Sequence, residues 1–247
     1  MTGPAAVATP GVEVVKENKM PAGIPFIISN EFAERFCFYG INSILTVYMV
    51  ANLQFTDAKA ASWQSMFKAG AYFFPMLGAI ISDVFWGKFK TIMIFSTVYA
   101  LGCVSLALFG STENLLIFSL FLVAVGTGGI KPCVSTNVGD QFSAKNAHLI
   151  ERAFSWFYLA INAGSSISIF LCPILLKDPA WGPKWAFGLP AVLMVAATIV
   201  FFLGRKKYTH VPPAGKKWLN EVTSKQGREV IFSLLGIYFF VAIFWML

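Results

Sequence analysis

The chain has 247 residues, of which 57% are hydrophobic and only 13% are charged. With 25 phenylalanines and a mean hydropathy of +0.67, it lies outside the range of soluble domains, and we predict an all-α membrane protein with several spans. The net charge of +7 does not indicate a nucleic-acid partner, because most of the cations lie in loops between apolar stretches.

Residues 1–23 precede the first apolar stretch and predict a disordered cytoplasmic tail, since they have no apolar segment of the kind found in a signal peptide. The first apolar stretch then covers residues 24–51. On a helix that rises ~1.5 Å per residue, it would cover roughly 40 Å, more than a hydrocarbon core of ~30 Å. We therefore predict the first membrane span here.

Three charged residues, Glu31, Glu34 and Arg35, lie inside this span. A charge at mid-membrane costs from ~2.5 to over 10 kcal/mol, so it is tolerated only when it faces another charge, a partner helix or a water-filled cavity. Glu31 and Arg35 are spaced i, i+4, which lets them pair within one helix. Two carboxylates beside one guanidinium leave a net negative site that can hold a proton. The alternative is a charge-neutral triad that only holds helices together.

Five further apolar runs follow the first span, separated by short polar breaks. They cover residues 58–82, 91–110, 115–138, 152–176 and 185–204. Together with the first span they predict a six-helix bundle over residues 24–204. A basic cytoplasmic linker over residues 205–228 leads to a seventh apolar run at 229–247, which we expect to be an incomplete seventh transmembrane helix of a truncated sequence.

The positions of the cations predict how the spans are oriented. Thirteen of the 19 Lys and Arg residues fall in segments on the same side as residues 1–23, and only three fall on the other side. The N-terminus is therefore expected to be cytoplasmic. Six spans, a long basic linker and the start of a seventh span are typical of the first half of a twelve-helix, two-bundle transporter. The loop at residues 83–90 also resembles the major facilitator signature.

Polar groups on four of the predicted helices fall at one depth. Counted from the inner end of each span, residues 31–35, Tyr72, Lys131 and Asn162 all lie about 10–16 Å deep. Such a layer is expected to line a cavity for substrate and coupling ion between two transporter bundles.

A flexible point is predicted beside Lys131. Pro132 removes one helical hydrogen bond and clashes with the carbonyl of Gly128, while Gly126 and Gly129 lie within the same turns. These residues predict a gate next to the cation, with a simple packing kink as the alternative.

The remaining ionisable and thiol side chains limit the possible chemistry. His148 and His210 fall in predicted loops, so proton coupling would depend on carboxylates, and an intramembrane Ser/His protease is disfavoured. We therefore expect no enzyme, and no cofactor or metal besides the coupling proton. The four cysteines lie in separate apolar segments without metal-ligand spacing and are expected to pack. Lys68 has no evident partner, and either snorkels or faces the cavity.

Three motifs resemble those of the proton-coupled oligopeptide transporter family of the major facilitator superfamily. They are EFAERFCFYG at residues 31–40, GTGGIKPC at 126–133 continuing to GDQF at 139–142, and FSWFY at 154–158 continuing to INAGS at 161–165. The motifs occur in the expected order and on the expected spans. The resemblance covers about residues 24–204.

The resemblance implies cotransport of protons with di- and tripeptides by alternating access, in a plasma membrane or a bacterial inner membrane. Glu31 and Glu34 would handle the proton, with Arg35 as their partner and Lys131 as the coupled cation. The residues that would touch the peptide or line its pocket are Arg35, Tyr39, Tyr72, Lys131 and Asn162. Membrane lipids and a second, C-terminal bundle of the same transporter are the other implied partners, and no nucleic acid is implied.

Four positions depart from the family pattern. Phe38 replaces a tyrosine, Asn42 stands where an arginine is common, and Ser65 occupies the place of a histidine in animal relatives. Lys68 stands where an apolar residue is usual, and an added cation could alter the preference for substrate charge. These departures leave open transport of nitrate or another anion by the same fold. A third alternative is a non-transporting membrane sensor or assembly protein.

Overall fold

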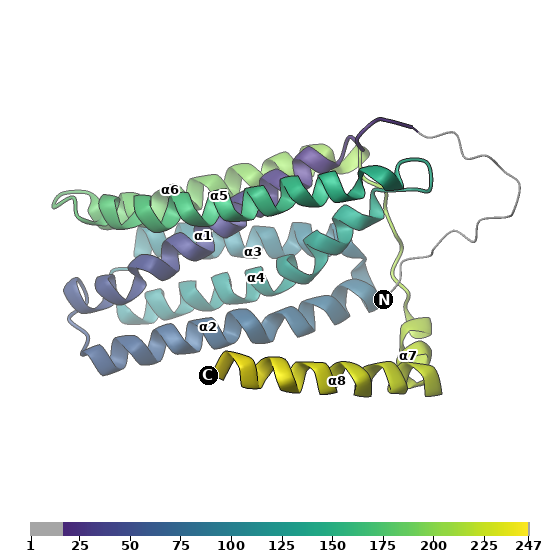
Figure 1. The fold of residues 1–247 in the computed structure, drawn as a ribbon. Coiled ribbons are helices and arrows are strands. Elements are labelled where there is room, and N and C mark those ends of the chain that lie inside the picture. Colours follow the sequence, from purple (N-terminus) through teal and green to yellow (C-terminus); the bar gives the residue numbers. More distant parts are fainter. Residues whose placement is uncertain (1–16, 247) are drawn as a thin grey trace, which may run out of the picture.

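A computed structural model describes residues 17–246 of the chain, and its α-helices follow one another with short connections (Figure 1). The helices are α1 (Ile24–Ala51), α2 (Asp57–Ile80), α3 (Lys88–Phe109), α4 (Glu113–Asp140), α5 (Ile150–Leu176), α6 (Gly182–Leu203), α7 (Lys216–Thr223) and α8 (Lys225–Met246). A π-helical segment, η1 (Ile81–Trp86), extends α2, and the short 3-10 segments η2 (Ala147–Leu149) and η3 (Gly204–Lys206) flank α5 and α6.

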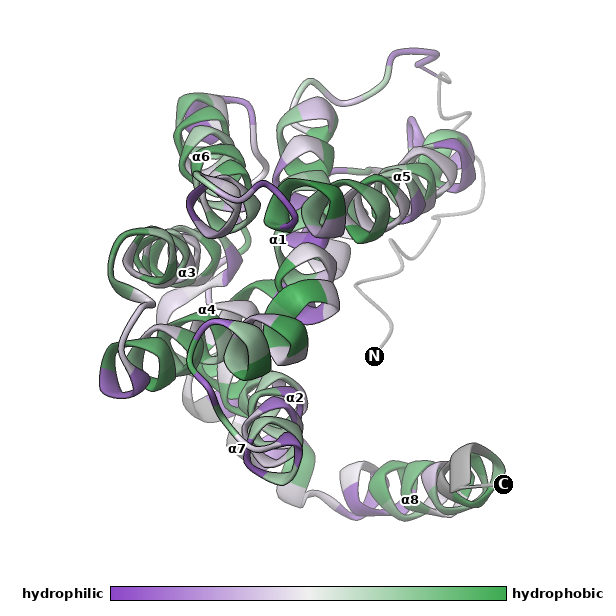
Figure 2. Cartoon of the chain, turned by 90° about the vertical axis from the view of Figure 1, so that its left-hand side faces the viewer, coloured by the Kyte–Doolittle hydropathy of each residue, from purple (hydrophilic) through white to green (hydrophobic). Residues whose placement is uncertain are grey.

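Helices α1 to α6 form one bundle, which confirms the predicted six-helix bundle. The closest packing is between α3 and α4, α1 and α5, α2 and α4, α3 and α6, and α1 and α6. Seen along the bundle in Figure 2, α1 lies between α4, α5 and α6. This central position explains why α1 can hold charged residues, because more than half of its side chains face protein.

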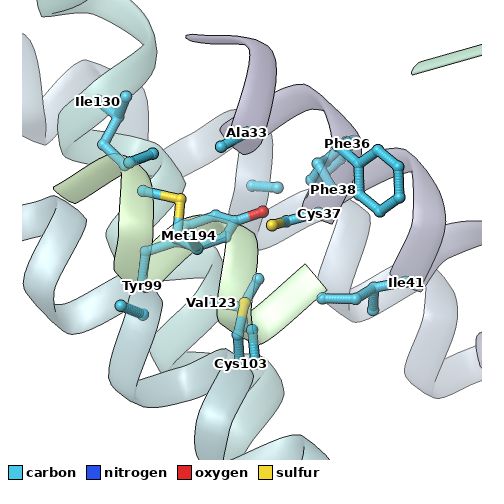
Figure 3. Packing of buried hydrophobic residues seen from close by; sticks show 14 of the residues in the cluster. Ala33, Phe36, Cys37, Phe38, Ile41, Tyr99, Cys103, Val123, Ile130 and Met194 are labelled. Carbon is cyan, nitrogen blue, oxygen red and sulfur yellow. The ribbon is translucent and has the colours of Figure 1, made fainter. Parts of the chain in front are cut away.

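The apolar core lies between α1, α3, α4 and α6. Figure 3 shows part of it, with Ala33, Phe36, Cys37, Phe38 and Ile41 from α1, Tyr99 and Cys103 from α3, Val123 and Ile130 from α4, and Met194 from α6. As expected for packing residues, the four cysteines are buried and free. The Cys37 thiol also donates a hydrogen bond to the carbonyl of Pro190 at 2.9 Å.

Five stretches of the described chain are long and apolar enough to cross a membrane. They are Asp57–Trp86, Lys88–Phe109, Glu113–Asp140, Ala147–Leu176 and Gly182–Lys206. α1 has 28 residues, enough to span as well, but three charged side chains lie near its middle. The second span runs further than its predicted end, through η1 to Trp86. It stops at Gly87, whose φ of 75° lies in the left-handed region that favours glycine.

The segments on either side of the bundle belong to the predicted tail and linker. Most of the tail, residues 1–16, lies outside the described residues. Glu17 N donates to the Lys145 carbonyl at 3.0 Å, and Asn18 bonds His148, so the last part of the tail lies against the loop before α5. The bundle end formed by this loop, by η1 and by η3 is called the linker end below.

The linker runs along the linker end of the bundle, where α7 still contacts η1. Tyr208 stacks on Phe201, its hydroxyl donates to the Phe201 carbonyl at 2.9 Å, and burial raises the pKa of that hydroxyl. Ala214 N donates to the Asp83 carbonyl at 2.7 Å. Beyond this point the linker forms α7, and α8 then extends beside but apart from the six-helix bundle (Figure 2), with its described side chains largely exposed.

Candidate functional site

The three charged residues of α1 face one another inside the bundle. Arg35 Nε donates to Glu31 Oε1 at 2.6 Å, the i, i+4 pair predicted from the sequence, and it lies 3.4 Å from Glu34 Oε2. The side chains of Glu31 and Glu34 are 1% and 0% exposed, whereas that of Arg35 is 18% exposed. One guanidinium thus pairs with two carboxylates in a site that is nearly closed to solvent, and Arg35 is the most exposed of the three.

Glu34 is the deeper of the two acids and is held by two further helices. The Thr127 hydroxyl of α4 donates to Glu34 Oε1, and the Tyr99 hydroxyl of α3 donates to the Glu34 backbone carbonyl at 3.5 Å. Sequence reasoning missed both partners. Thr127 lies inside the glycine-rich motif that was noted for flexibility, and its hydroxyl was a usable signal. Tyr99 gave no signal, because it is a single aromatic residue in an apolar helix.

Lys131 of α4 lies between two aromatic rings. Its Nζ is 4.0 Å from the centroid of the Phe38 ring and 5.4 Å from that of Tyr72. Among the ion pairs of residues 17–246, none joins Lys131 to Glu31 or Glu34, although both carboxylates are close enough to attract it. A cation over an aromatic face gains about 0.5–2 kcal/mol. Lys131 is therefore held by rings and can be released at a small cost.

The other residues predicted to contact the peptide, Tyr39, Tyr72 and Asn162, are more exposed than Glu31 and Glu34. Tyr39 is half-buried and packs edge-on against Phe38, with ring centroids 5.5 Å apart, while Tyr72 is 71% exposed. Asn162 is exposed, and its Nδ2 donates to the Tyr158 carbonyl of its own helix at 2.8 Å. The structure thus brings Glu31, Glu34 and Arg35 into contact and Tyr72 next to Lys131, and it leaves Asn162 bonded within α5.

Helix α5 nevertheless passes close to the triad. Gly164, two residues after Asn162, lies against α1, because a methyl group there would come within 2.6 Å of the Phe32 carbonyl and 3.5 Å of Arg35 Cβ. Only glycine allows this approach of the two backbones. Asn162 is two positions away, about 200° around the helix, so it projects from another, exposed side of α5.

The glycines of the predicted gate mark close helix contacts. A side chain at Gly126 would collide with Tyr99, one at Gly128 with Phe74, and one at Gly129 with Phe95. Helix α4 runs without interruption from Glu113 to Asp140, with Pro132 inside it. The packing role of these glycines is therefore visible in the structure, and their role in gating stays a prediction.

The structure shows the contacts of two positions that depart from the family pattern, Asn42 and Lys68. Gln64 Nε2 donates to Asn42 Oδ1 and to the Asn42 carbonyl, each at 3.2 Å, so Asn42 connects α1 to α2. Lys68 is exposed, and no ion pair of the described chain includes it. His148 lies in the 3-10 segment η2 and His210 in the loop after η3, and no group of three metal-binding side chains is found in the described part of the chain.

The chain is similar to membrane transporters along most of its length. The family model described as the POT family matches residues 89–232. Solute carrier family 15 member 2 of Rattus norvegicus is 45% identical over 207 residues, which cover 79% of this chain and 28% of that protein. Peptide transporter family 1 of Drosophila melanogaster is 43% identical over 208 residues, with the same two shares. The chain thus matches about a quarter of the length of these relatives.

Solved structures give the same picture. An in meso crystal structure of the POT family transporter PepTSo aligns with a TM-score of 0.75 and 44% identity, covering 79% of this chain and 39% of that one. A crystal structure of a peptide transporter POT in complex with sulfate aligns with a TM-score of 0.72 and 27% identity, covering 91% and 48%. The chain therefore belongs to the POT family, and α1 to α6 are a six-helix bundle of the major facilitator fold.

Proposed function

We propose that this chain is part of a symporter that carries di- and tripeptides together with protons across a membrane by alternating access. The observation that carries the proposal is the buried pair of carboxylates around Arg35, with Lys131 held nearby on aromatic rings. The relatives named above are peptide transporters or solute carriers, and a solved peptide transporter at 26% identity holds alafosfalin. We propose the same class of substrate here.

Protonation of Glu31 or Glu34 determines whether Arg35 is free to bind the peptide. With both acids ionised, Arg35 is engaged by Glu31 at 2.6 Å and by Glu34 at 3.4 Å. A proton on either acid removes one of these attractions, so the guanidinium can turn its exposed edge toward a peptide carboxylate. Lys131 can leave the Phe38 ring for the same carboxylate, since it breaks no ion pair of the described chain to do so.

The remaining contacts would orient the peptide. Tyr39 would offer a hydroxyl, Asn162 would offer its amide oxygen from the exposed side of α5, and the exposed ring of Tyr72 would line the pocket next to Lys131. Because the proton and the peptide act on the same cations, each favours binding of the other. Loss of the proton lets Glu31 or Glu34 recapture Arg35, which favours release of the peptide.

The bundle by itself supplies one wall of such a site. Only 17% of the apolar stretch in Asp57–Trp86 is buried, and α8 exposes large apolar residues such as Phe232, Tyr238 and Phe240. We propose that a second bundle of the complete transporter covers these surfaces, with lipid around both. We also propose a plasma or bacterial inner membrane, a cytoplasmic N-terminus, no cofactor besides the proton, and gating at Gly126, Gly128, Gly129 and Pro132.

The test is uptake of a labelled dipeptide by proteoliposomes that contain the complete transporter. Glu34→Gln and Lys131→Ala should each abolish uptake driven by a pH gradient, because one removes a proton site and the other a peptide cation. Glu113→Gln is the matched control, since Glu113 pairs with Lys59 at the surface and should leave uptake unchanged. Full gradient-driven uptake by either variant, or uptake of nitrate with none of dipeptide, would refute the proposal.

A further inference from the structure

The bundle interior near the linker end contains polar side chains that the proposed function does not use. Asn30 of α1 and Ser96 of α3 are 0% exposed, and Asn137 of α4 is 3% exposed. Within the described residues, neither polar atom of the Asn30 amide has a hydrogen-bond partner, and Ser96 Oγ and Asn137 Nδ2 have none either. An unpaired buried polar group costs about 1–3 kcal/mol, so these groups require partners other than protein.

These side chains continue from Glu34 toward the linker end. Asn30 lies one turn from Glu34 on the same face of α1, about 6 Å along the helix axis. Glu34 Oε2 likewise accepts no hydrogen bond in the part of the chain that the structure describes. Ser96 lies one turn before Tyr99, whose hydroxyl reaches the Glu34 carbonyl at 3.5 Å. Unpaired polar atoms thus lie one helical turn from Glu34 on α1 and one turn from its partner Tyr99 on α3.

The row ends at Gln141, where α4 meets the linker. Gln141 Nε2 donates to Asn137 Oδ1 at 3.2 Å, and its Oε1 accepts from Thr209 N at 2.9 Å. A methyl group at Gly23 would come within 3.0 Å of Gln141 Oε1, so Gly23 and Gln141 lie at the same depth. Counted from there along α1 and α4, Asn30 and Asn137 differ in depth by about 4.5 Å, so the two amides lie at similar levels of the bundle.

We propose that Asn30, Ser96 and Asn137 hold a chain of buried water molecules that carries protons between Glu34 and the linker end of the bundle. The proposal rests on the proton coupling proposed above. A buried water typically makes about three hydrogen bonds to groups that lack other partners, which matches the donors and acceptors left over here. Asn30 contributes both a donor and an acceptor, so it can orient waters on either side of it.

The transfer balances without any further reactant. The Glu34 carboxyl gives its proton to the nearest water, each water passes one of its own protons on, and one proton leaves beside Gln141. The carboxylate that remains pairs with Arg35. The titratable groups that face Glu34 are Glu31 and Arg35 on α1, Tyr99 on α3 and Lys131 on α4, with the Cys37 thiol nearby.

This route is separate from the peptide side of the site. The Arg35 side chain is 18% exposed, whereas Asn30 and Ser96 are 0% exposed and lie wholly inside the bundle. A proton could therefore leave Glu34 without passing a bound peptide.

The experiment compares two transport modes of the complete transporter in proteoliposomes. Counterflow exchange of labelled for unlabelled dipeptide needs no net proton release, whereas accumulation driven by a pH gradient does. Asn30→Leu and Asn137→Leu should each lower accumulation by about ten-fold or more while leaving exchange within about two-fold, because only proton transfer is impaired. Asn30→Ser, which keeps a hydroxyl that can hold water, should restore most of the accumulation. Asn114→Leu, at an exposed surface position, is the control and should change neither mode.

Thermal unfolding supplies a readout that does not depend on transport. If Asn30 holds water, Asn30→Leu should leave the midpoint unchanged or lower it, because a hydrated network is lost. A raised midpoint would mean that the amide was unpaired and dry, and this result, or unchanged accumulation in both leucine variants, would overturn the proposal. If the unmodified protein exchanges no dipeptide at all, the proposed function fails, and the unfolding result still decides whether the site is hydrated.

Discussion

The two halves of the bundle interior differ in whether their buried polar side chains have hydrogen-bond partners. Toward the linker end, buried polar atoms of Asn30, Glu34, Ser96 and Asn137 lack a hydrogen-bond partner among residues 17–246. Large apolar side chains are buried in both halves, such as Ile27 and Phe201 toward the linker end and Leu106 and Leu116 in the opposite half.

The polar groups buried in that opposite half are paired. The Tyr48 hydroxyl donates to the Gly110 carbonyl at 3.1 Å, and the Ser119 hydroxyl lies 2.7 Å from that of Ser105. We infer that this half is a fixed apolar seal, because its polar groups are satisfied within the protein. The linker half can exchange partners with water or protons, and the acids lie where the two halves meet.

The strongest test of the linker half is removal of Arg35, the cation that pairs with its buried acids. Arg35→Leu would leave Glu31 and Glu34 buried without a positive partner, and breaking a buried ion pair in this way costs about 3–5 kcal/mol. We expect gradient-driven dipeptide uptake to be lost and the thermal unfolding midpoint to fall. Arg35→Lys keeps the charge but loses the planar set of N–H donors of the guanidinium, and it should retain more stability than Arg35→Leu. Equal stability of the two variants would show that the charge of Arg35 is not what the acids require.

The apolar half should tolerate a polar side chain much less well than the linker half. Leu106 of α3 is 2% exposed, and Leu106→Asn would bury an amide where no unpaired donor or acceptor of the described chain is available. We expect a loss of about 2–4 kcal/mol in the free energy of unfolding, from lost packing and an unpaired amide. Leu106→Met, which conserves volume, should cost less than about 1.5 kcal/mol. If the asparagine is tolerated as well as the methionine, the contrast between the halves is wrong.

The sequence predicted the helices and the pair within α1 because both depend on local spacing. Apolar run length determined the spans to within a few residues, and the i, i+4 spacing predicted the contact of Glu31 with Arg35. Arg35 was predicted as a partner of Glu34, but the contacts from Thr127, Tyr99 and Phe38 were missed, because they come from other helices or other turns. Of these, only the Thr127 hydroxyl, inside a noted motif, offered a signal. Asn30 was overlooked because one asparagine in an apolar run looks like any other until its surroundings are known.

The aromatic support of Lys131 lies at the boundary between the two halves. Phe38→Leu removes the ring 4.0 Å from Lys131 Nζ, so the ammonium should shift toward the carboxylates of Glu31 and Glu34 and be less available to a peptide. We expect dipeptide affinity to fall by about 2-fold or more, because leaving two carboxylates costs the ammonium more than leaving a ring that holds it by about 0.5–2 kcal/mol. Phe38→Tyr keeps the ring and should bind dipeptide normally. Phe67→Leu is the matched control, because that ring lies 5.8 Å from Phe38 and no cation–π contact joins it to Lys131.

The smallest expected effect lies at the surface of the apolar half. Lys59 of α2 and Glu113 of α4 form an ion pair at 2.6 Å, with side chains 43% and 40% exposed. Solvent and salt screen such a pair, so a double-mutant cycle with Lys59→Met and Glu113→Gln should give a coupling of only about 0.2–1 kcal/mol in unfolding, decreasing as salt is added. A larger coupling that persists in high salt would mean that α2 and α4 are held together at this end by charge. The seal would then depend on an ionic contact as well as on apolar packing, and the division between the two halves would be less sharp than the buried side chains alone indicate.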